Sequence, residues 1–505
     1  MLHLLFALAA AAACASPAVA HSPHAAREVA KHGKHQVIAR EMSSGRLAKR
    51  YPPDRETFIP TTTPVWMLSQ TAAAAATPTS SSSASQAATT TLAPGQFGAT
   101  TTRALVAATT AVATTCAPAY VAPTVIAGTG TLPKPTSFVR RKNARSQQLA
   151  VDGVDFTIVG PNIYWLCQDE NYGPIGSYTD KGRVREALAI AVAMGATTIR
   201  ALSCGISVGN NNPYNLEPSY QNYNDAAWDI RDYVLYAARE YGLRVIMTMT
   251  DNYDYYHGGK YDFIDFRHGS RANKGSQFYT NRAIQQAYGW YIQNFLMHVN
   301  AYTGVTYAND PTILAWETGN ELGGYINAEM WPPMQWTTQI VRFIAQYDTN
   351  HLIIDGTNGF WNYTNNAIPD GLRNRAVDIM TDHGYPRNTG ILAREVTIAQ
   401  TYAKGFFIGE YDWTTTGSTV TLDAYLAAIE AQGSYLGDMI WNVMGHDPQC
   451  CAFVSHNDGY SMYYPNGNSA ADQQNILKVV QHWYRVTKRT IPTALPAVSC
   501  PQPVF

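Results

Sequence analysis

The chain carries little charge and has no surplus of either sign. Charged residues make up 14% of its 505 residues, with 36 Lys and Arg against 37 Asp and Glu, so the formal net charge is -1. Ordinary globular chains contain roughly 25% charged residues. A nucleic-acid-binding protein normally carries a basic surplus or a basic patch, so this balance argues against that class.

Long apolar runs are also missing. The run over residues 4–13 is too short to cross a bilayer, and no later segment supplies about 20 unbroken apolar residues, which argues against a membrane protein. The short run leads into Ala18-Val19-Ala20, which fits the small-residue rule for signal-peptide cleavage, although no Lys or Arg precedes it. We therefore expect a secreted, extracellular protein that loses residues 1–20.

The sequence lacks the motifs that hold nucleotides or metal ions. No Gly-rich phosphate loop follows the first candidate strand. Asp251, Asp254 and His257 lie close together along the chain, but their spacing fits no zinc motif. We therefore expect no cofactor and no metal, and a monomer whose partner is its substrate.

Composition divides the rest of the chain at about residue 137. Residues 21–50 are polar and basic and end in Lys49-Arg50, which fits either a processed pro-segment or a chance dibasic pair. Residues 51–136 are rich in Ser, Thr, Ala and Pro and offer few large apolar side chains, so we expect a disordered, O-glycosylated stalk. Residues 137–505 have ordinary globular composition and form the expected folded domain.

Cysteines are few but even in number once the signal peptide is removed. Six remain, which favours disulfides in an oxidising compartment. Cys167 and Cys204 fall just past neighbouring candidate strands and could pair. Of the vicinal Cys450 and Cys451, at most one is expected to bridge a distant Cys of the domain. Asn362 begins an N-glycosylation sequon.

Within the folded domain, short apolar runs alternate with amphipathic stretches, the pattern of repeated βα units. The candidate strands are residues 156–161, 197–202, 244–250, 313–316, 352–355, 377–381, 405–408 and 438–441. The candidate helices are residues 181–194, 228–241, 282–302, 334–346, 392–403, 422–432 and 472–485, with a fifth helix poorly marked after residue 355. This order indicates an α/β fold, the (β/α)8 or TIM barrel, with a doubly wound open sheet as the alternative.

Two glutamates stand at the strand ends where such barrels carry their function. Glu321 follows the fourth strand and Glu410 ends the seventh, so their carboxyls would face each other across one opening. Glycoside hydrolysis needs such a pair, one protonated to donate to the leaving oxygen and one ionised to attack the anomeric carbon. The 32 Tyr and 11 Trp agree in part, because those that are not in the core would suit flat, hydroxylated ligands such as sugars.

The motifs around these glutamates resemble those of glycoside hydrolase family 5, in particular its fungal endo-β-1,4-mannanase branch. The strings WETGNEL (residues 316–322) and IGEYDW (residues 408–413) are similar to its acid/base and nucleophile motifs. The similarity runs from about residue 137 to 490 and includes TIRAL around Arg200. It also includes DGVDFTIVGPNIYWL (residues 152–166), TDNYDYYHGG (residues 250–259), DHGYP (residues 382–386) and NDGYSMYYP (residues 457–465).

The resemblance implies a division of catalytic roles. Glu321 would be the general acid/base and Glu410 the nucleophile of a secreted retaining endo-β-1,4-glycan hydrolase. Arg200 would hold the nucleophile ionised, Tyr385 would hydrogen-bond it, and His383 would orient the acid/base. A cation beside Glu410 lowers its pKa, whereas a hydrophobic or hydrogen-bonded setting keeps Glu321 protonated.

The resemblance also implies the substrate contacts. Asn320 would bind the 2-hydroxyl of the sugar, Trp441 would form the floor under the cleaved residue, and the Asn252 loop would contact the chain. Mannan, glucomannan or galactomannan is the expected substrate, and recognition of its axial 2-hydroxyl would fall to Asn320, Arg200 and Glu410.

Four positions depart from the family pattern. Leu322 stands where the family usually has Pro, and Tyr411 where Phe is common. Leu202 replaces an aromatic residue of the mannanases, and residues 387–389 replace a common Trp. Because two sugar-stacking platforms are lost, a β-glucanase of the same family and a non-catalytic polysaccharide-binding wall protein remain alternatives.

Other aromatic side chains could replace the lost platforms. The candidates are Trp165, Tyr253, Trp361 and Trp413.

Overall fold

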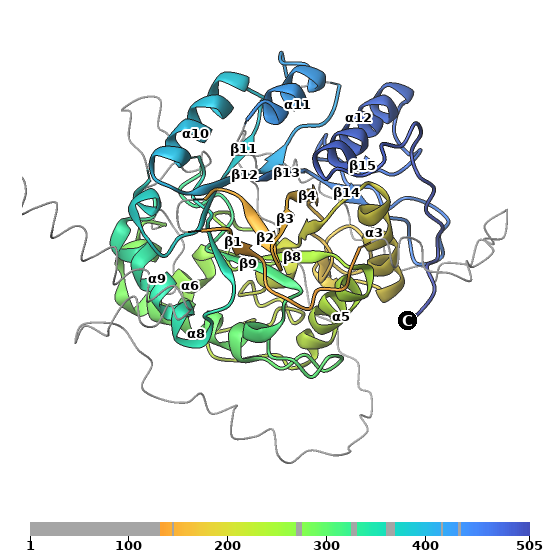
Figure 1. Ribbon diagram of the computed structural model, residues 1–505. Coiled ribbons are helices and arrows are strands. Elements are labelled where there is room, and N and C mark those ends of the chain that lie inside the picture. Colours follow the sequence, from red (N-terminus) through yellow and green to blue (C-terminus); the bar gives the residue numbers. More distant parts are fainter. Residues whose placement is uncertain are drawn as a thin grey trace, which may run out of the picture.

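A computed structural model describes residues 132–143, 146–268, 275–324, 331–359, 369–415, 418–432 and 436–505 (Figure 1). The expected signal peptide, pro-segment and nearly all of the stalk fall outside these ranges, as do Trp361 and the sequon at Asn362. Among the described residues, no helix has the length and apolar character needed to cross a membrane.

Eight parallel strands form a barrel. They are β4 (Ile158–Pro161), β7 (Thr198–Arg200), β8 (Arg244–Thr248), β9 (Ile313–Glu317), β10 (Leu352–Asp355), β11 (Ile379–Gly384), β12 (Gly405–Tyr411) and β13 (Gly437–Ile440). Their spatial order is β4-β13-β12-β11-β10-β9-β8-β7. The ring closes because the Thr197 N–H donates to the Val159 carbonyl at 2.8 Å and the Ile163 N–H to the Arg200 carbonyl at 2.9 Å. The predicted (β/α)8 barrel is confirmed, and the open sheet is wrong.

Helices surround the strands (Figure 1). The long ones are α3 (Lys181–Ala193), α5 (Ala226–Tyr241), α8 (Arg282–Met297), α9 (Met334–Tyr347), α10 (Thr389–Thr401), α11 (Leu422–Glu430) and α12 (Ala470–Val486). Several begin at side chains that accept hydrogen bonds from first-turn N–H groups, namely Asp180, Asn281, Asn388, Thr421 and Ser469. After β10, where the sequence marks its helix poorly, the described residues contain only the 3-10 helix η3 (Asp370–Arg373).

Short elements fill the connections. The short helices are α4 (Leu202–Gly205), α6 (Lys260–His268), α7 (Gln277–Thr280) and η2 (Tyr307–Asn309). The short strands are β1 (Arg140–Arg141), β2 (Leu149–Val151), β3 (Val154–Phe156), β5 (Gln168–Asp169), β6 (Ser177–Tyr178), β14 (Val443–Met444) and β15 (Met462–Tyr463).

One predicted helix ends earlier than its apolar pattern suggests. The pattern continues to residue 302, but α8 ends at Met297 and His298 is extended. The His298 ring stacks on Trp228 with centroids 3.7 Å apart, and its Nε2 lies 2.8 Å from Oδ1 of Asp232. These contacts with α5 hold the chain away from the helical path.

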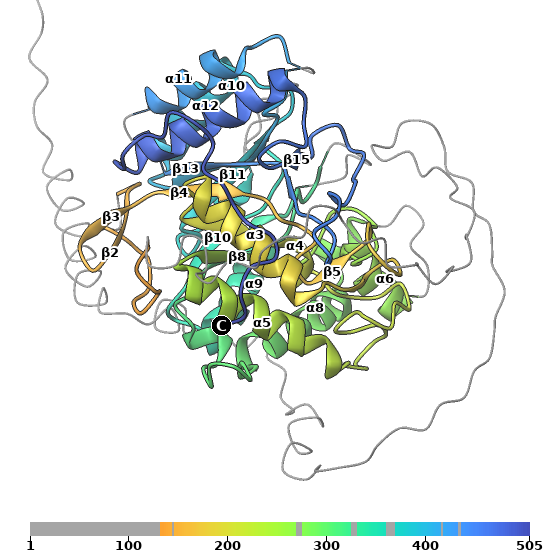
Figure 2. The ribbon, with the colours of Figure 1, turned by 90° about the vertical axis from the view of Figure 1, so that its right-hand side faces the viewer.

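The two ends of the barrel differ in chemistry. A cluster of buried apolar side chains contributed by strands of the barrel, among them Ile246, Ile354 and Phe407, packs with Val139 and Leu149 near the amino-terminal end. The antiparallel sheet β1-β2-β3 lies at this end, and β5 and β15 lie at the other (Figure 2). With the amino-terminal end filled by apolar groups, the polar groups of the strands lie at the carboxyl ends.

Two disulfides between described residues fix loops at the carboxyl ends. Cys167 pairs with Cys204, with their Cα atoms 4.9 Å apart, as the sequence predicts. Cys450 pairs with Cys500, with their Cα atoms 5.6 Å apart, and ties the C-terminal segment to the loop after β13. Cys450 is thus the member of the vicinal pair that bridges a distant Cys of the described domain.

A buried histidine joins the last helix to the last strand. Nε2 of His482 in α12 lies 2.9 Å from Oδ2 of Asp438 in β13, and its Nδ1 lies 2.7 Å from Oε1 of Glu430 in α11. Burial lowers the pKa of His482, but these two carboxylates outweigh it and raise the pKa from 6.5 to about 9. The charged histidine therefore stabilises the fold.

Replacing His482 by Gln is expected to destabilise the protein by about 3 kcal/mol at pH 6. Because the folded pKa lies above the unfolded one, this contribution is fully present below about pH 6.5 and is lost as pH rises through about 9. Urea unfolding at pH 6, 8 and 10 measures it, with His268→Gln, an exposed histidine of α6, as the control. A difference that stays constant over this range would contradict the prediction.

Candidate active site

The carboxyl ends of β7, β9 and β12 place three ionisable side chains together. Arg200 is the last residue of β7, Glu317 is the last of β9, and Glu410 lies near the end of β12. Glu321 follows β9 by four residues, in a turn whose backbone is held on both sides. The Asn320 N–H donates to the Thr250 carbonyl at 2.8 Å and the Leu322 N–H to the Gly356 carbonyl at 2.9 Å.

Between these anchors Glu321 adopts a left-handed backbone with φ of 49°. Residues other than glycine rarely occupy this region, and those that do often lie at functional sites. The Leu322 N–H that holds the turn could not exist in proline. The departure from the family pattern at this position therefore supplies a hydrogen bond that fixes the direction of the Glu321 side chain.

Arg200 donates hydrogen bonds to four side chains of the site. Its Nε and Nη2 donate to the two carboxylate oxygens of Glu317 at 2.8 and 3.1 Å, and its Nη1 donates to Oε1 of Glu410 at 2.7 Å. Nη2 also donates to Oδ1 of Asn320 at 2.8 Å, and Nη1 to Oδ1 of Asn162 at 3.0 Å. These bonds use all five N–H groups of a fully buried guanidinium, so its plane is fixed.

His383 connects the two candidate catalytic carboxyls. Its Nδ1 lies 2.5 Å from Oε1 of Glu321 and 3.5 Å from Oε2 of Glu410, and one carboxylate oxygen of each glutamate lies within 4.8 Å of the other. In the sheet His383 pairs with Glu410, after a register shift between Asp382 and His383. Such a bulge re-aims the side chain that follows it. The Tyr253 hydroxyl donates to Oε2 of Glu321 at 2.6 Å, and the Tyr385 hydroxyl to Oε2 of Glu410 at 3.3 Å.

The three groups titrate as a unit because they share these contacts. Burial raises the pKa of Glu410 to about 7, with Glu321 acting in the same direction and His383 and Arg200 opposing it. Burial also opposes ionisation of Glu321, but His383 and the Tyr253 hydroxyl outweigh it and lower the pKa of Glu321. Burial lowers the pKa of His383, yet the two carboxylates outweigh it and raise that pKa.

These contacts oppose the expected division of protons between the two glutamates. The sequence predicts a protonated Glu321 and an ionised Glu410, whereas the shorter contact of His383 with Glu321 favours the ionised form of Glu321. Moving the shared proton from His383 to Glu321 would remove the negative charge beside Glu410 and leave Arg200 to favour its ionised form.

Asn320 and Trp441 are each fixed in place by neighbouring side chains. The carbonyl oxygen of Asn320 accepts from Arg200, and its amide nitrogen donates one N–H to Oδ1 of Asp251 at 3.1 Å. The second N–H of that amide has no hydrogen-bond acceptor among the residues that the structure describes. The half-buried indole of Trp441 donates to Oδ2 of Asp458 at 2.7 Å and stacks on Tyr164 with centroids 5.3 Å apart.

Two other residues that were predicted to bind substrate are completely buried. Trp165 and Trp413 are both 0% exposed, and their indole N–H groups donate to backbone carbonyls of Val443 and Tyr460. Without exposed surface neither can stack on a sugar, so the prediction is corrected for both.

The loop after β8 also differs from expectation. Asn252 is 2% exposed, and its Oδ1 accepts from Nζ of Lys260 at 2.7 Å and from the Gly323 N–H at 3.0 Å. It therefore supports the loop around Glu321 rather than the ligand. Tyr253 is buried and contacts Glu321, so its expected role as a stacking platform is replaced by a contact with the candidate acid/base.

The positions of the lost platforms have structural roles. Leu202 is buried at the start of α4. Arg387 is buried and donates to the carbonyls of Val420 at 3.0 Å and Thr414 at 3.2 Å, and so holds the loop after β12.

The sequence interpretation missed Glu317 and Asp458, and it named Asp251 without its role as a hydrogen-bond partner of Asn320. The available signal for Glu317 was an acidic residue at the end of an apolar strand, inside the WETGNEL string. Asp251 and Asp458 also lie within strings that carry the family resemblance, but their partners, Asn320 and Trp441, are distant in sequence.

Within the described ranges, two clusters have the residue types of a metal site. One is Glu186, His446 and Cys500, but the Cys500 sulfur is in a disulfide. The other is Glu321, His383 and Glu410, whose facing atoms are already hydrogen-bonded to one another and to their neighbours. His257 and Asp251, considered above, form a pair at 3.0 Å, and Asp254 is exposed.

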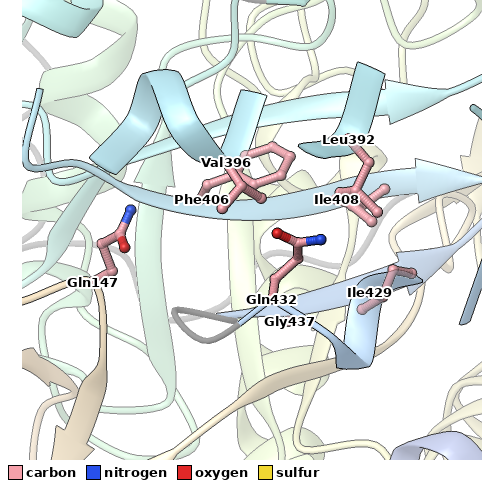
Figure 3. Close-up of a pocket in the computed structure, with 8 residues that line it drawn as sticks. All are labelled: Gln147, Leu392, Val396, Phe406, Ile408, Ile429, Gln432 and Gly437. Atoms are coloured by element: carbon pink, nitrogen blue, oxygen red, sulfur yellow. The ribbon is translucent and has the colours of Figure 1, made fainter. Parts of the chain in front are cut away.

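A separate hollow lies between α10, α11 and β12, near the amino ends of β12 and β13 (Figure 3). Apolar side chains including Val396, Phe406 and Ile429 line it, with Gln147 and Gln432 at its edge. A second hollow, lined by Asp382 and Glu395 together with His383 and Tyr385, adjoins the site.

Comparisons with known proteins agree with this geometry. The protein-family model described as GH family 5 beta-mannosidase-like matches residues 136–418. Mannan endo-1,4-beta-mannosidase 1 of Oryza sativa subsp. japonica is 28% identical in an alignment of 380 positions, which covers 65% of this chain and 82% of the relative. Mannan endo-1,4-beta-mannosidase 2 of the same plant is 30% identical in an alignment of 273 positions, which covers 50% of this chain and 58% of the relative.

Among solved structures, the endo-1,4-beta-mannanase of Rhizomucor miehei superposes with a TM-score of 0.55 at 21% identity, covering 70% of this chain and all of that one. At this identity the likeness supports the fold alone. The family model covers more than half of the chain, and the catalytic motifs lie at the strand ends where the fold requires them. The chain belongs to glycoside hydrolase family 5.

Proposed function

We propose that the protein hydrolyses internal linkages of β-1,4-mannan, glucomannan or galactomannan with net retention at the anomeric carbon. The observation that carries the mechanism is the separation of Glu321 and Glu410, since one carboxylate oxygen of each lies within 4.8 Å of one of the other. Retaining enzymes hold their carboxyls about 5–5.5 Å apart, whereas inverting enzymes need about 6.5–9.5 Å to admit a water.

The first step would form a bond between an oxygen of Glu410 and the anomeric carbon. The bond from that carbon to the leaving oxygen breaks, and Glu321 gives its proton to the leaving oxygen. In the second step Glu321 takes a proton from water, whose oxygen attacks the same carbon and releases Glu410. Arg200, whose Nη1 donates to Glu410, stabilises the carboxylate before attack and after release.

The free N–H of Asn320 beside Glu410 supports recognition of the 2-hydroxyl. A buried site that hydrogen-bonds a substrate hydroxyl discriminates strongly against analogues that cannot offer it. Trp441, held by Asp458 and Tyr164, supports a stacked sugar next to these groups. The names of the rice relatives, mannan endo-1,4-beta-mannosidases, favour mannose over glucose in this position.

The substrate is tested by incubating the purified protein with mannan, glucomannan, carboxymethyl cellulose and β-1,3-glucan. We expect reducing ends from the first two substrates, and proton NMR should detect the β-anomer of the product before mutarotation. Hydrolysis of cellulose or β-1,3-glucan alone would favour the β-glucanase alternative. Oligosaccharides that are bound but unchanged would favour the non-catalytic wall protein.

We also propose that the enzyme acts outside the cell. Support comes from the signal-peptide pattern of residues 1–20 and from the Cys167–Cys204 and Cys450–Cys500 disulfides, which are typical of proteins folded in oxidising compartments.

A further inference from the structure

Glu317 is a third carboxylate in the site, without a role in the two-step reaction. It is fully buried and pairs with Arg200 through two hydrogen bonds, whereas Glu410 receives one. The Thr248 hydroxyl donates to it, and β8 and β9 set Thr248 directly opposite Glu317 in the sheet. Its position is therefore fixed by the barrel itself.

The arrangement divides one positive charge between two carboxylates. Bidentate binding to Glu317 sets the plane of the guanidinium, and this plane aims Nη1 at Glu410 and Nη2 at Asn320. The negative charge of Glu317 also offsets part of the field that Arg200 exerts on Glu410. Both effects are strong because the side chains of Arg200 and Glu317 are 0% exposed, so water does not screen them.

Other charged groups face these two carboxylates from the surrounding elements. Glu410 faces Glu321 from the turn after β9, His383 from β11, and Tyr385 directly after β11. Glu317 lies near Tyr288 of α8 and Asp355 of β10. A change at Glu317 leaves all of these groups in place, which makes its own contribution measurable.

We propose that Glu317 is a positioning residue that orients Arg200 toward the nucleophile and Asn320 and limits how strongly Arg200 favours the ionised nucleophile. This inference rests on the proposed retaining hydrolysis. Two substitutions separate the geometric effect of Glu317 from its electrostatic effect. Glu317→Asp keeps the negative charge but shortens the side chain, whereas Glu317→Gln keeps the length of the side chain but removes the charge.

The test is the pH profile of kcat/KM on mannan for the full chain and for three variants. Glu317→Gln should move the acidic limb down by about one pH unit, because the nucleophile loses a negative neighbour, and should lower the optimum value about 10- to 100-fold. Glu317→Asp should leave that limb in place and lower kcat more than it changes KM. Glu186→Gln, which removes a buried carboxylate paired with His446, should match the unaltered protein.

The outcomes distinguish a failure of this inference from a failure of the proposed function. An unshifted limb in Glu317→Gln would overturn the inference while leaving the hydrolase assignment intact. If Glu317→Gln fails to fold, a shifted limb in Glu317→Asp would overturn it instead, because that variant keeps the charge. Absence of any glycan hydrolysis by the unaltered protein would overturn the proposed function and the inference with it.

Discussion

Glu410→Gln is expected to lower kcat on mannan by about four orders of magnitude or more without unfolding the protein. The amide oxygen of Gln can still accept from Nη1 of Arg200, which now donates to Oε1 of Glu410 at 2.7 Å. The amide cannot form the covalent intermediate, so the reaction loses its nucleophile. Steady-state rates with long incubation times measure the loss, and thermal unfolding checks the fold.

Glu217→Gln is the matched control for this variant. Glu217 is equally buried, in the loop after β7, and accepts from the Gln221 N–H at 2.7 Å rather than from any group of the site. Its replacement should leave kcat within a few-fold of the unaltered value. A Glu410→Gln variant that retains more than about a hundredth of the original rate would show that this carboxyl is not the nucleophile.

Glu321→Ala is expected to separate substrates by their leaving groups. On mannan, whose leaving alcohol needs a proton, kcat/KM should fall by about 10³ or more, in line with loss of a general acid. On a β-mannoside with a dinitrophenyl leaving group the first step needs no proton, so that step should remain fast. The second step lacks its base, and the glycosyl-enzyme on Glu410 should accumulate and be detectable by mass spectrometry of the intact protein.

Tyr253→Phe provides the comparison for Glu321→Ala. It removes only the hydroxyl that donates to Oε2 of Glu321 at 2.6 Å and should raise the pKa of Glu321. The basic limb of the pH profile of kcat/KM should move to higher pH. The ratio of the rates on mannan and on the dinitrophenyl mannoside should stay close to that of the unaltered protein. Equal losses on mannan and on the activated mannoside in Glu321→Ala would contradict the acid/base assignment.

The fold followed from the sequence because its signals are local. Alternating apolar runs and amphipathic stretches mark the βα units other than the fifth. Helix α3 begins at Lys181, as the pattern predicts, whereas α10 begins at Thr389, three residues before its predicted start. The positions of Glu321 and Glu410 followed from the same information, since a residue at the end of a barrel strand lies at one known end of the molecule. The Cys167–Cys204 pair was foreseen for the same reason.

The surroundings of the two glutamates were decided by tertiary structure. Trp165 and Trp441 both have mainly apolar sequence neighbours, and Trp413 has polar ones, yet packing buries Trp165 and Trp413 completely and leaves Trp441 half-exposed beside Tyr164. Burial of an aromatic ring depends on which distant segments cover it, and local sequence does not contain that information.

Tertiary structure also decided which carboxylates contact Arg200 and His383. Glu317 shares Arg200 with Glu410 because β7, β9 and β12 bring residues from three parts of the chain to one point. A bulge precedes His383, whose ring lies nearer to Glu321 than to Glu410, and this shorter contact favours the ionised form of Glu321. The sequence determined which groups stand at the mouth of the barrel, whereas their separations, which govern electrostatic energies within a buried site, exist only in the folded chain.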